Sequence, residues 1–209
     1  MLSSLDWATI SSLATAAGTL VLAIATFAAV RSGNRSQRLA ERAFQFNLRP
    51  ILTPSHLEDP KQRIMFGDRH WVTFQGGRAA VEVADGVIYL AMGVRNIGNG
   101  IGVIEAWNPF PAQRSSVDPY EPVESFRPQS RSLWVPPGDV AFWQGALRDE
   151  TEEIRAPMLA AIKDGGISVD LLYRDHEGGQ RTISRFSVVC DDALDAWVVG
   201  LGSHRSLDD

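Results

Sequence analysis

Three adjacent residues near the C-terminus, Asp175-His176-Glu177, have side chains that serve in acid–base chemistry and as metal ligands. They directly precede Gly178-Gly179, which predicts a hairpin tip where neighbouring side chains diverge and water screens their charges. The other histidines, His56, His70 and His204, lack the paired spacing that places two metal ligands on one helix face. We therefore expect a solvated turn here, with neither a metal site nor a bound cofactor.

The single cysteine and a glycine-rich motif are the next residues that suggest chemistry. Cys190 ends the run Ser187–Cys190, which predicts a small buried side chain, and a nucleophilic role would need a histidine from another segment. The motif Gly98-Asn99-Gly100-Ile101-Gly102 follows a predicted strand, but Val103 stands where a dinucleotide-binding G-x-G-x-x-G motif needs its last glycine. We interpret the motif as a turn in which Asn96 hydrogen-bonds nearby backbone. The G-x-S-x-G motif of serine hydrolases does not occur.

The N-terminal region contains 23 consecutive residues without a charge, residues 8–30. As a helix they reach about 35 Å, enough to cross a hydrocarbon core of roughly 30 Å. Trp7 is suited to one membrane interface, and we expect the Ser and Thr hydroxyls of the span to bond to carbonyls of their own helix. A signal peptide cleaved near Ala23-Ile24-Ala25 is one alternative, although the required upstream Lys or Arg is missing. A buried core helix is the other.

The segment after this span, residues 31–49, carries five Arg and one Glu and predicts a basic juxtamembrane helix. Four of its arginines, Arg31, Arg35, Arg38 and Arg42, are spaced 4, 3 and 4 residues apart and fall on one stripe of a helix. Positive flanks stay on the cytoplasmic side, so we expect the N-terminus outside and the C-terminal domain inside, at the plasma or inner membrane. The same arginines are candidates for contact with anionic lipid headgroups.

Two further patterns bear on this anchor region, residues 1–49. Gly33-Asn34 predicts a break that would lay the basic segment along the membrane surface. Ala14-x-x-x-Gly18 and Ala25-x-x-x-Ala29 have the small-x-x-x-small form through which two copies of a span can pair.

From Pro50 onward the chain predicts a β-sandwich domain, residues 50–209, with short apolar runs separated by Gly- and Pro-rich turns. The predicted strands are Ile51–Leu52, His70–Phe74, Val81–Val83, Val87–Val94, Ile101–Trp107, Val140–Trp143, Ile167–Tyr173 and Thr182–Val189. A Pro-rich segment at 108–131 predicts a long loop or lid, and residues 150–163 predict a short helix in which Pro157 marks a kink or the first turn.

The composition restricts the function classes. The 209 residues carry a net charge of −5, which argues against a nucleic-acid-binding role. A single cysteine excludes an internal disulfide framework and any multi-cysteine metal cluster.

A resemblance follows from the order of these features. The chain contains, in this order, a single span, a basic extension, Arg49-Pro50-x-Leu52, a strand ending in Val94–Gly100, and the late motif Leu172-Tyr173-Arg174-Asp175. The chain resembles a broad group of bacterial single-pass membrane proteins that carry a small immunoglobulin-like domain and whose functions are mostly uncharacterised. The resemblance implies an immunoglobulin-like β-sandwich behind one transmembrane helix, and it offers no catalytic residues.

The favoured function is a membrane-tethered cytoplasmic interaction or sensory module that is not an enzyme and that binds a protein partner. Aromatic residues in and beside the long loop, Trp107, Phe110, Tyr120 and Trp134, are the candidates for the partner surface. One alternative is an anchored hydrolase built on Asp175, His176 or His70. Another is the same sandwich exported to the cell exterior.

Overall fold

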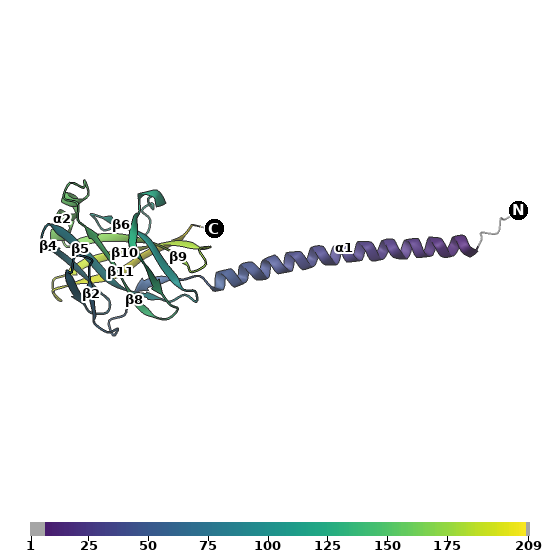
Figure 1. Cartoon of the computed structure of the whole chain (residues 1–209), viewed down its shortest axis with the longest axis horizontal. Coiled ribbons are helices and arrows are strands. Elements are labelled where there is room, and N and C mark those ends of the chain that lie inside the picture. Colours follow the sequence, from purple (N-terminus) through teal and green to yellow (C-terminus); the bar gives the residue numbers. More distant parts are fainter. Residues whose placement is uncertain (1–6, 208–209) are drawn as a thin grey trace. The chain divides into compact units, whose positions relative to one another are not determined.

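The computed structural model describes residues 7–207, and for Ala8 and residues 41–47 it describes the backbone alone. The chain divides into two compact units, Met1–Phe46 and Asn47–Asp209 (Figure 1). The first consists of the N-terminal helix and the second is mainly β, so the predicted fold class is confirmed, and the curled sheet of the second unit fits a sandwich.

Helix α1 runs without interruption over Trp7–Asn47, a length of 41 residues or about 60 Å. The break predicted at Gly33-Asn34 is therefore wrong: one glycine is tolerated in a helix at a cost of about 1 kcal/mol relative to alanine. The segment Thr9–Ala40 has a peak mean hydropathy of 2.1, and by length and composition it can cross a membrane. The expected bonding of hydroxyls to the helix is confirmed for four residues, Ser12, Thr15, Thr19 and Thr26.

The described part of the domain contains eleven strands. They are β1 Leu52–Pro54, β2 Gln62–Met65, β3 Trp71–Phe74, β4 Arg78–Ala84, β5 Val87–Asn96, β6 Gly102–Phe110, β7 Arg127–Val135, β8 Val140–Leu147, β9 Gly166–Asp175, β10 Arg181–Asp191 and β11 Ala196–Ser206. Nine form one curled antiparallel sheet in the order β1-β5-β4-β11-β10-β9-β6-β7, with β8 also paired to β5. Strands β2 and β3 form a separate hairpin.

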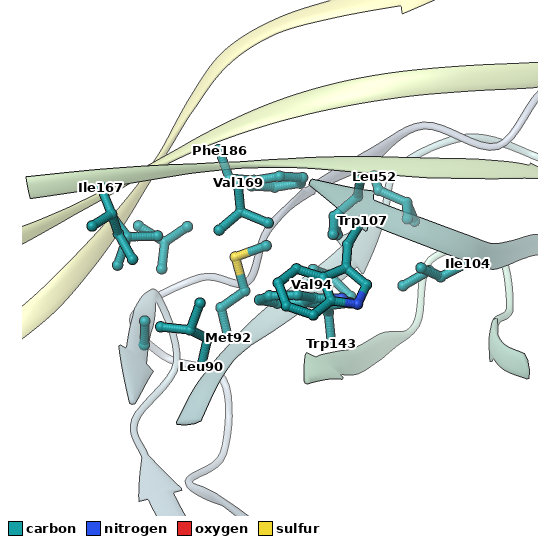
Figure 2. Close-up of a cluster of buried hydrophobic side chains, with 14 of the residues drawn as sticks. Leu52, Leu90, Met92, Val94, Ile104, Trp107, Trp143, Ile167, Val169 and Phe186 are labelled. Carbon is teal, nitrogen blue, oxygen red and sulfur yellow. The ribbon is translucent and has the colours of Figure 1, made fainter. Parts of the chain in front are cut away.

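The curl of the sheet brings β5 and β8 over β6, β9 and β10 and encloses the main core (Figure 2). At its centre the rings of Trp107 and Trp143 meet edge to face with centroids 5.3 Å apart. Gly145 permits this pair, because a Cβ atom there would lie against both indole rings. Helix α2, Arg155–Lys163, inserts the fully buried Met158 into the same core.

The structure revises two predicted boundaries. The predicted helix at 150–163 begins only at Arg155, so Pro157 lies in its first turn, where proline is favoured. The predicted loop at 108–131 is shorter, since β6 continues to Phe110 and β7 begins at Arg127; the short helix η1, Val123–Ser125, lies between them.

Each side of the sandwich is covered from outside by a non-core segment. The β2–β3 hairpin lies over β4 and β5 through an apolar cluster of Ile64, Phe66, Val72, Phe74, Ala80, Tyr89 and Ala91. Residues 111–126, here called the clamp loop, lie over β6, β9 and β10. Their apolar contacts are fewer: Phe126, Tyr120 and Val123 pack against Ala106, Leu172 and Ile183.

Candidate functional site

The four predicted partner-surface aromatics are not brought together as one exposed patch. Trp107 has only 5% of its surface exposed, because β6 continues through this position and turns the indole toward Trp143. Its proposed role in a partner surface is therefore wrong. Phe110 and Tyr120 are half-buried beneath arginine side chains, while Trp134, on β7, remains 55% exposed.

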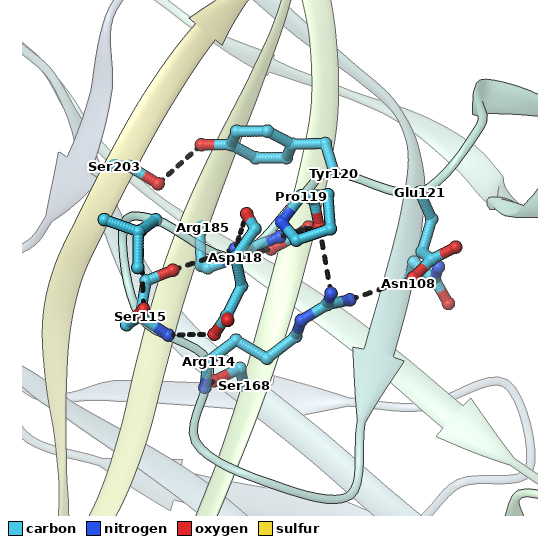
Figure 3. Close-up of polar contacts among 12 residues, drawn as sticks. Asn108, Arg114, Ser115, Asp118, Pro119, Tyr120, Glu121, Ser168, Arg185 and Ser203 are labelled. Atoms are coloured by element: carbon cyan, nitrogen blue, oxygen red, sulfur yellow. Dashed lines mark hydrogen bonds and ion pairs between the residues drawn. The ribbon is translucent and has the colours of Figure 1, made fainter.

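The clamp loop is held by one completely buried ion pair, Asp170 with Arg185. The Arg185 Nε and Nη2 atoms donate to the two Asp170 carboxylate oxygens, each at 2.9 Å. Its remaining N–H groups donate to main-chain carbonyls of the loop: Nη1 to Ser115 and Asp118 at 3.0 and 2.9 Å, and Nη2 to Pro119 at 3.3 Å (Figure 3). All five guanidinium donors are thus satisfied.

Electrostatics and ring stacking strengthen this arrangement. The hydrogen bonds that Arg185 donates to Asp170 raise the pKa of Arg185 above its ordinary value, which keeps the guanidinium charged. The guanidinium carbon lies 4.4 Å from the centroid of the Tyr120 ring, at cation–π distance. The Tyr120 hydroxyl in turn bonds to Ser203 Oγ at 2.6 Å (Figure 3).

A second arginine, Arg114, lies within the clamp loop itself and links parts of it to one another and to the sheet (Figure 3). Arg114 donates to the Pro119 carbonyl at 2.9 Å and pairs with Glu121 at 3.1 Å, while its main-chain N–H donates to Ser168 Oγ. Its guanidinium also covers the Phe110 ring. Phe110 and Tyr120, two of the predicted partner residues, therefore serve to hold the clamp loop against the sheet.

The Asp170–Arg185 pair was missed by the sequence analysis, although a signal for it exists. Both strands and the turn at Gly178-Gly179 were predicted. The ladder is centred between Glu177 and Gly178, one residue before the Gly178-Gly179 pair, and this register places Arg185 opposite Asp170. The available signal was a pair of opposite charges at paired positions of two strands, both of which were predicted to be buried.

The glycine-rich motif forms the turn that was predicted, between β5 and β6, and Asn96 organises it. Asn96 Oδ1 accepts from the N–H groups of Ile51 and Gly98 at 3.1 and 3.0 Å. Its Nδ2 donates to the carbonyls of Gly100 and Val135 at 2.6 and 2.9 Å, so the fully buried amide makes four bonds.

The glycines of this turn leave room for the chain that enters the domain. A Cβ atom at Gly98 would overlap the carbonyl oxygen of Arg49, and one at Gly100 would overlap that of Leu48. The motif is therefore a clasp around residues 48–51, and this accounts for its glycines without a nucleotide.

The predicted acid–base residues separate into a solvated turn and a structural cluster. Asp175-His176-Glu177 lie at the end of β9, where Asp175 accepts from the Gly179 N–H at 2.9 Å and the side chains of His176 and Glu177 are 4.0 Å apart. Among residues 7–207, no group of three or more His, Cys, Asp or Glu side chains forms a metal site. Cys190 is a half-buried free thiol whose main-chain N–H bonds to Gly165.

His70 belongs to a group of titratable side chains beneath the β2–β3 turn. Its Nε2 lies 2.9 Å from Glu82 Oε2, and its ring stacks on Tyr89 with centroids 4.0 Å apart. The Tyr89 hydroxyl donates to Asp68 at 2.8 Å, and Arg148 donates to the same carboxylate oxygen at 3.1 Å.

The pKa shifts in this cluster follow from its hydrogen bonds. Burial acts to raise the pKa of Asp68, but bonds from Tyr89, the His70 N–H and Arg148 outweigh it and hold the pKa below its ordinary value. Burial and the Asp68 carboxylate raise the pKa of Tyr89. The Tyr89 proton therefore stays on the hydroxyl and links β5 to the hairpin turn.

A buried serine, Ser184, contacts a histidine that is exposed at the surface of β11. Ser184 Oγ is 2.7 Å from His204 Nδ1 and 2.8 Å from the Tyr173 hydroxyl. Burial lowers the pKa of His204. Because Ser184 has no exposed surface, the pair cannot meet a substrate, and we interpret it as a structural relay between β9, β10 and β11. Ser184 and His204 are neighbours across two strands, so no local sequence motif predicts their contact.

The lipid-contact candidates lie on the surface of α1. Arg31, Arg35 and Arg38 are exposed on the helix, and with no break at Gly33-Asn34 their stripe is continuous. The side chain of Arg42 lies outside the described residues. Contact with lipid stays a prediction. No family model and no curated protein matches the chain, so its function must be argued from these features.

Proposed function

We propose that this chain is a membrane-tethered interaction module in which α1 is the tether and the β-sandwich is held on the cytoplasmic side to bind a protein partner. The observation that carries the proposal is the single unbroken helix that begins as an apolar span and continues as an arginine-bearing stalk. If the bilayer takes up residues 8–30, the 17 residues from Arg31 to Asn47 extend about 25 Å beyond it.

The cytoplasmic orientation is supported by the charges on the two sides of the span. Residues 31–49 carry a net charge of +4, whereas residues 1–7 carry one Asp and no cation. Moving clustered arginines through the bilayer centre costs about 2.5–3.5 kcal/mol each on insertion scales. The same arginines attract anionic headgroups, while residues 50–209, with 15 basic and 23 acidic residues, carry −8 and are repelled by them.

A binding role is supported by how the domain uses its polar groups. The buried charges Asp170 and Arg185 hold the clamp loop, and Ser184 is enclosed between strands. Asp68 and Tyr89 join the hairpin turn to β5. These groups are committed to one another in positions that stabilise the fold.

Topology is the sharpest test of the proposal. In a Cys190→Ser background, a cysteine is placed at the exposed Ser116 of the clamp loop, and cells with a permeable outer envelope are treated with a membrane-impermeant thiol reagent. We expect labelling only after the inner membrane is opened. The matched variant carries its cysteine at Ser4 and is expected to react in intact cells. Labelling at Ser116 in intact cells would overturn the cytoplasmic assignment.

A further inference from the structure

Strand β4 leaves most of one edge open. It pairs with β5 along Ala79–Ala84, but β11 pairs with its other edge at only two positions, Trp197 opposite Ala79 and Val198 opposite Arg78. Within residues 7–207, no strand pairs with residues 80–84 on that side. An open strand edge carries unpaired main-chain donors and acceptors, which makes it a template for another strand.

The hairpin geometry identifies which groups are free. β4 and β5 are joined by the two-residue turn Asp85-Gly86, both residues having positive φ, 47° and 75°. Such a turn makes Ala84 and Val87 a hydrogen-bonded pair, and bonded pairs then alternate along the ladder. Val81 and Val83 therefore direct their N–H and C=O groups away from β5, toward the open edge. The same alternation is seen at Gly77, whose carbonyl accepts from Val199 N–H at 3.1 Å on this side.

A groove lies beside this edge. It has a volume of about 410 Å³ and is lined by parts of β3, β4 and the start of β11, including Thr73, Gln75, Glu82, Asp195 and Trp197. The turn before β11 ends at Asp195, so a segment laid along Val81 and Val83 would continue the line of β11 beyond that turn. From Ala79 to Asp85 an extended chain covers about 20 Å, or roughly six residues.

The charges at the ends of this edge select the occupant. Asp192 and Asp195 lie at the β11 end and Asp85 at the other, all three exposed, while Glu82 lines the groove between them. Two cations, Lys61 and Arg78, also line the groove. With the domain at −8 overall, a segment with basic residues at its two ends complements the site best.

We propose that the open edge of β4 binds an extended peptide segment of about six residues with basic ends, which adds to the sheet as a strand antiparallel to β4. Main-chain bonds to Val81 and Val83 supply the affinity, and the acidic residues at the two ends supply the preference for cations. This inference rests on the proposed interaction role but not on the proposed topology, so thiol labelling can fail while peptide binding holds.

The test uses the full chain in detergent micelles and a fluorescent octapeptide, KTVTVTVK, acetylated and amidated. We expect saturable binding by fluorescence anisotropy and at least a tenfold loss of affinity in Val83→Pro. Proline removes the free N–H, and because Val83 is in a non-hydrogen-bonded pair with β5 it leaves that ladder intact. The matched variant Val83→Thr keeps the N–H and is expected to bind within about twofold of the unsubstituted chain. Equal affinities for the two variants would overturn the proposal.

Two measurements on the unsubstituted chain keep the test independent of folding in the proline variant. Two further peptides are N-methylated at every second residue, one at the odd-numbered positions and the other at the even-numbered positions. We expect one of them to lose binding and the other to retain it, because only alternate N–H groups of the peptide face β4. The octapeptide with glutamate in place of its two lysines is expected to bind at least fivefold more weakly at 50 mM salt. Indifference to N-methylation, or equal binding of the glutamate peptide, would overturn the proposal. So would a dimer of the chain that Val83→Pro converts to monomer, which would assign the edge to a second copy.

Discussion

The β2–β3 hairpin and the clamp loop cover opposite sides of the same sandwich, but different forces hold them in place. The hairpin satisfies its main chain by pairing its own two strands and then adheres through apolar side chains such as Phe66 and Phe74. The clamp loop has carbonyls at Ser115, Asp118 and Pro119 that face the sheet, and each accepts a hydrogen bond from a donor outside the loop. Arg185 supplies those donors, and Asp170 neutralises its charge.

The difference shows what a buried charge contributes to this domain. A segment with regular pairing can be buried by apolar contact alone, whereas an irregular segment can be buried only if something bonds its carbonyls. A single guanidinium, with its five N–H donors, can bond several such carbonyls at once. The attachment of the clamp loop is consequently concentrated in one side chain, Arg185. The attachment of the hairpin is spread over an apolar cluster of seven side chains.

The largest expected effect comes from removing the donors of the clamp loop. Arg185→Met leaves Asp170 buried without a partner and removes one donor from each of three loop carbonyls, and we expect a loss of about 3–5 kcal/mol in the free energy of unfolding. Urea unfolding of the full chain in micelles, followed by tryptophan fluorescence, measures it. The matched control is Arg114→Met, whose partner Glu121 is 43% exposed, with an expected loss of less than about 1 kcal/mol. Equal losses would remove the special role of Arg185.

The second expected effect concerns the apolar cover. Phe66→Ala should cost about 3 kcal/mol through lost burial and the cavity left behind. Because the hairpin is a separate two-stranded sheet, we expect proteolysis to increase first within residues 57–77. Met65→Ala, at the exposed last residue of β2, is the control and should change stability by less than about 0.5 kcal/mol. Faster cleavage of the clamp loop in Phe66→Ala would mean that the two covers are coupled.

A smaller effect is expected from the one hydroxyl that joins the hairpin turn to β5. Tyr89→Phe removes the bond to the Asp68 carboxylate and should cost about 1 kcal/mol, measured by the same urea titration. Tyr120→Phe removes a bond to the neutral Ser203 under the clamp loop and should cost less. A larger loss in Tyr120→Phe would contradict the view that charge-assisted bonds matter more at the hairpin.

The smallest expected effect is a difference in how acid changes the stability of the β2–β3 hairpin and of the clamp loop. The folded-state pKa of Asp68 lies below its ordinary value, so its contribution to stability is present above about pH 4 and is lost as the pH falls through the folded pKa. For Asp170, burial raises the pKa while the bonds from Arg185 lower it, so we expect no comparable loss of stability at the clamp loop in this range. Between pH 5 and pH 3, hydrogen exchange should accelerate in residues 57–77 before residues 111–126. The reverse order would contradict the assignment.

Much of the fold could be predicted because apolar periodicity determines it. Val87–Val94 was identified as a strand from a continuous apolar run, and the structure explains that run by burial of β5 on both faces, against the core and against the hairpin. The strands that were missed lack such a signal. β7 is polar on both faces over most of its length, and β11 is interrupted by Gly200 and by Gly202, which bulges opposite Arg185 and Phe186.

The candidate sites were harder to predict because they depend on register. The turn around Asn96 was identified correctly since its partners are local, but the role of its glycines depends on residues 48–51, which are distant in sequence. The aromatic residues were interpreted from composition alone. Whether Trp107 faces the core or solvent is decided by the phase of β6, and a shift of one residue exchanges the two faces of a strand.

The clasp at Asn96 has a mechanical consequence. Any pull on the tether enters the domain at residues 48–51, where Ile51 is held by the Asn96 side chain and by the N–H of Ile97. From there the load passes to β1 and into β5, which is bonded to β1, β4 and β8 at once. The domain is thus attached to its tether through a short strand that passes the load directly to a strand paired with three others.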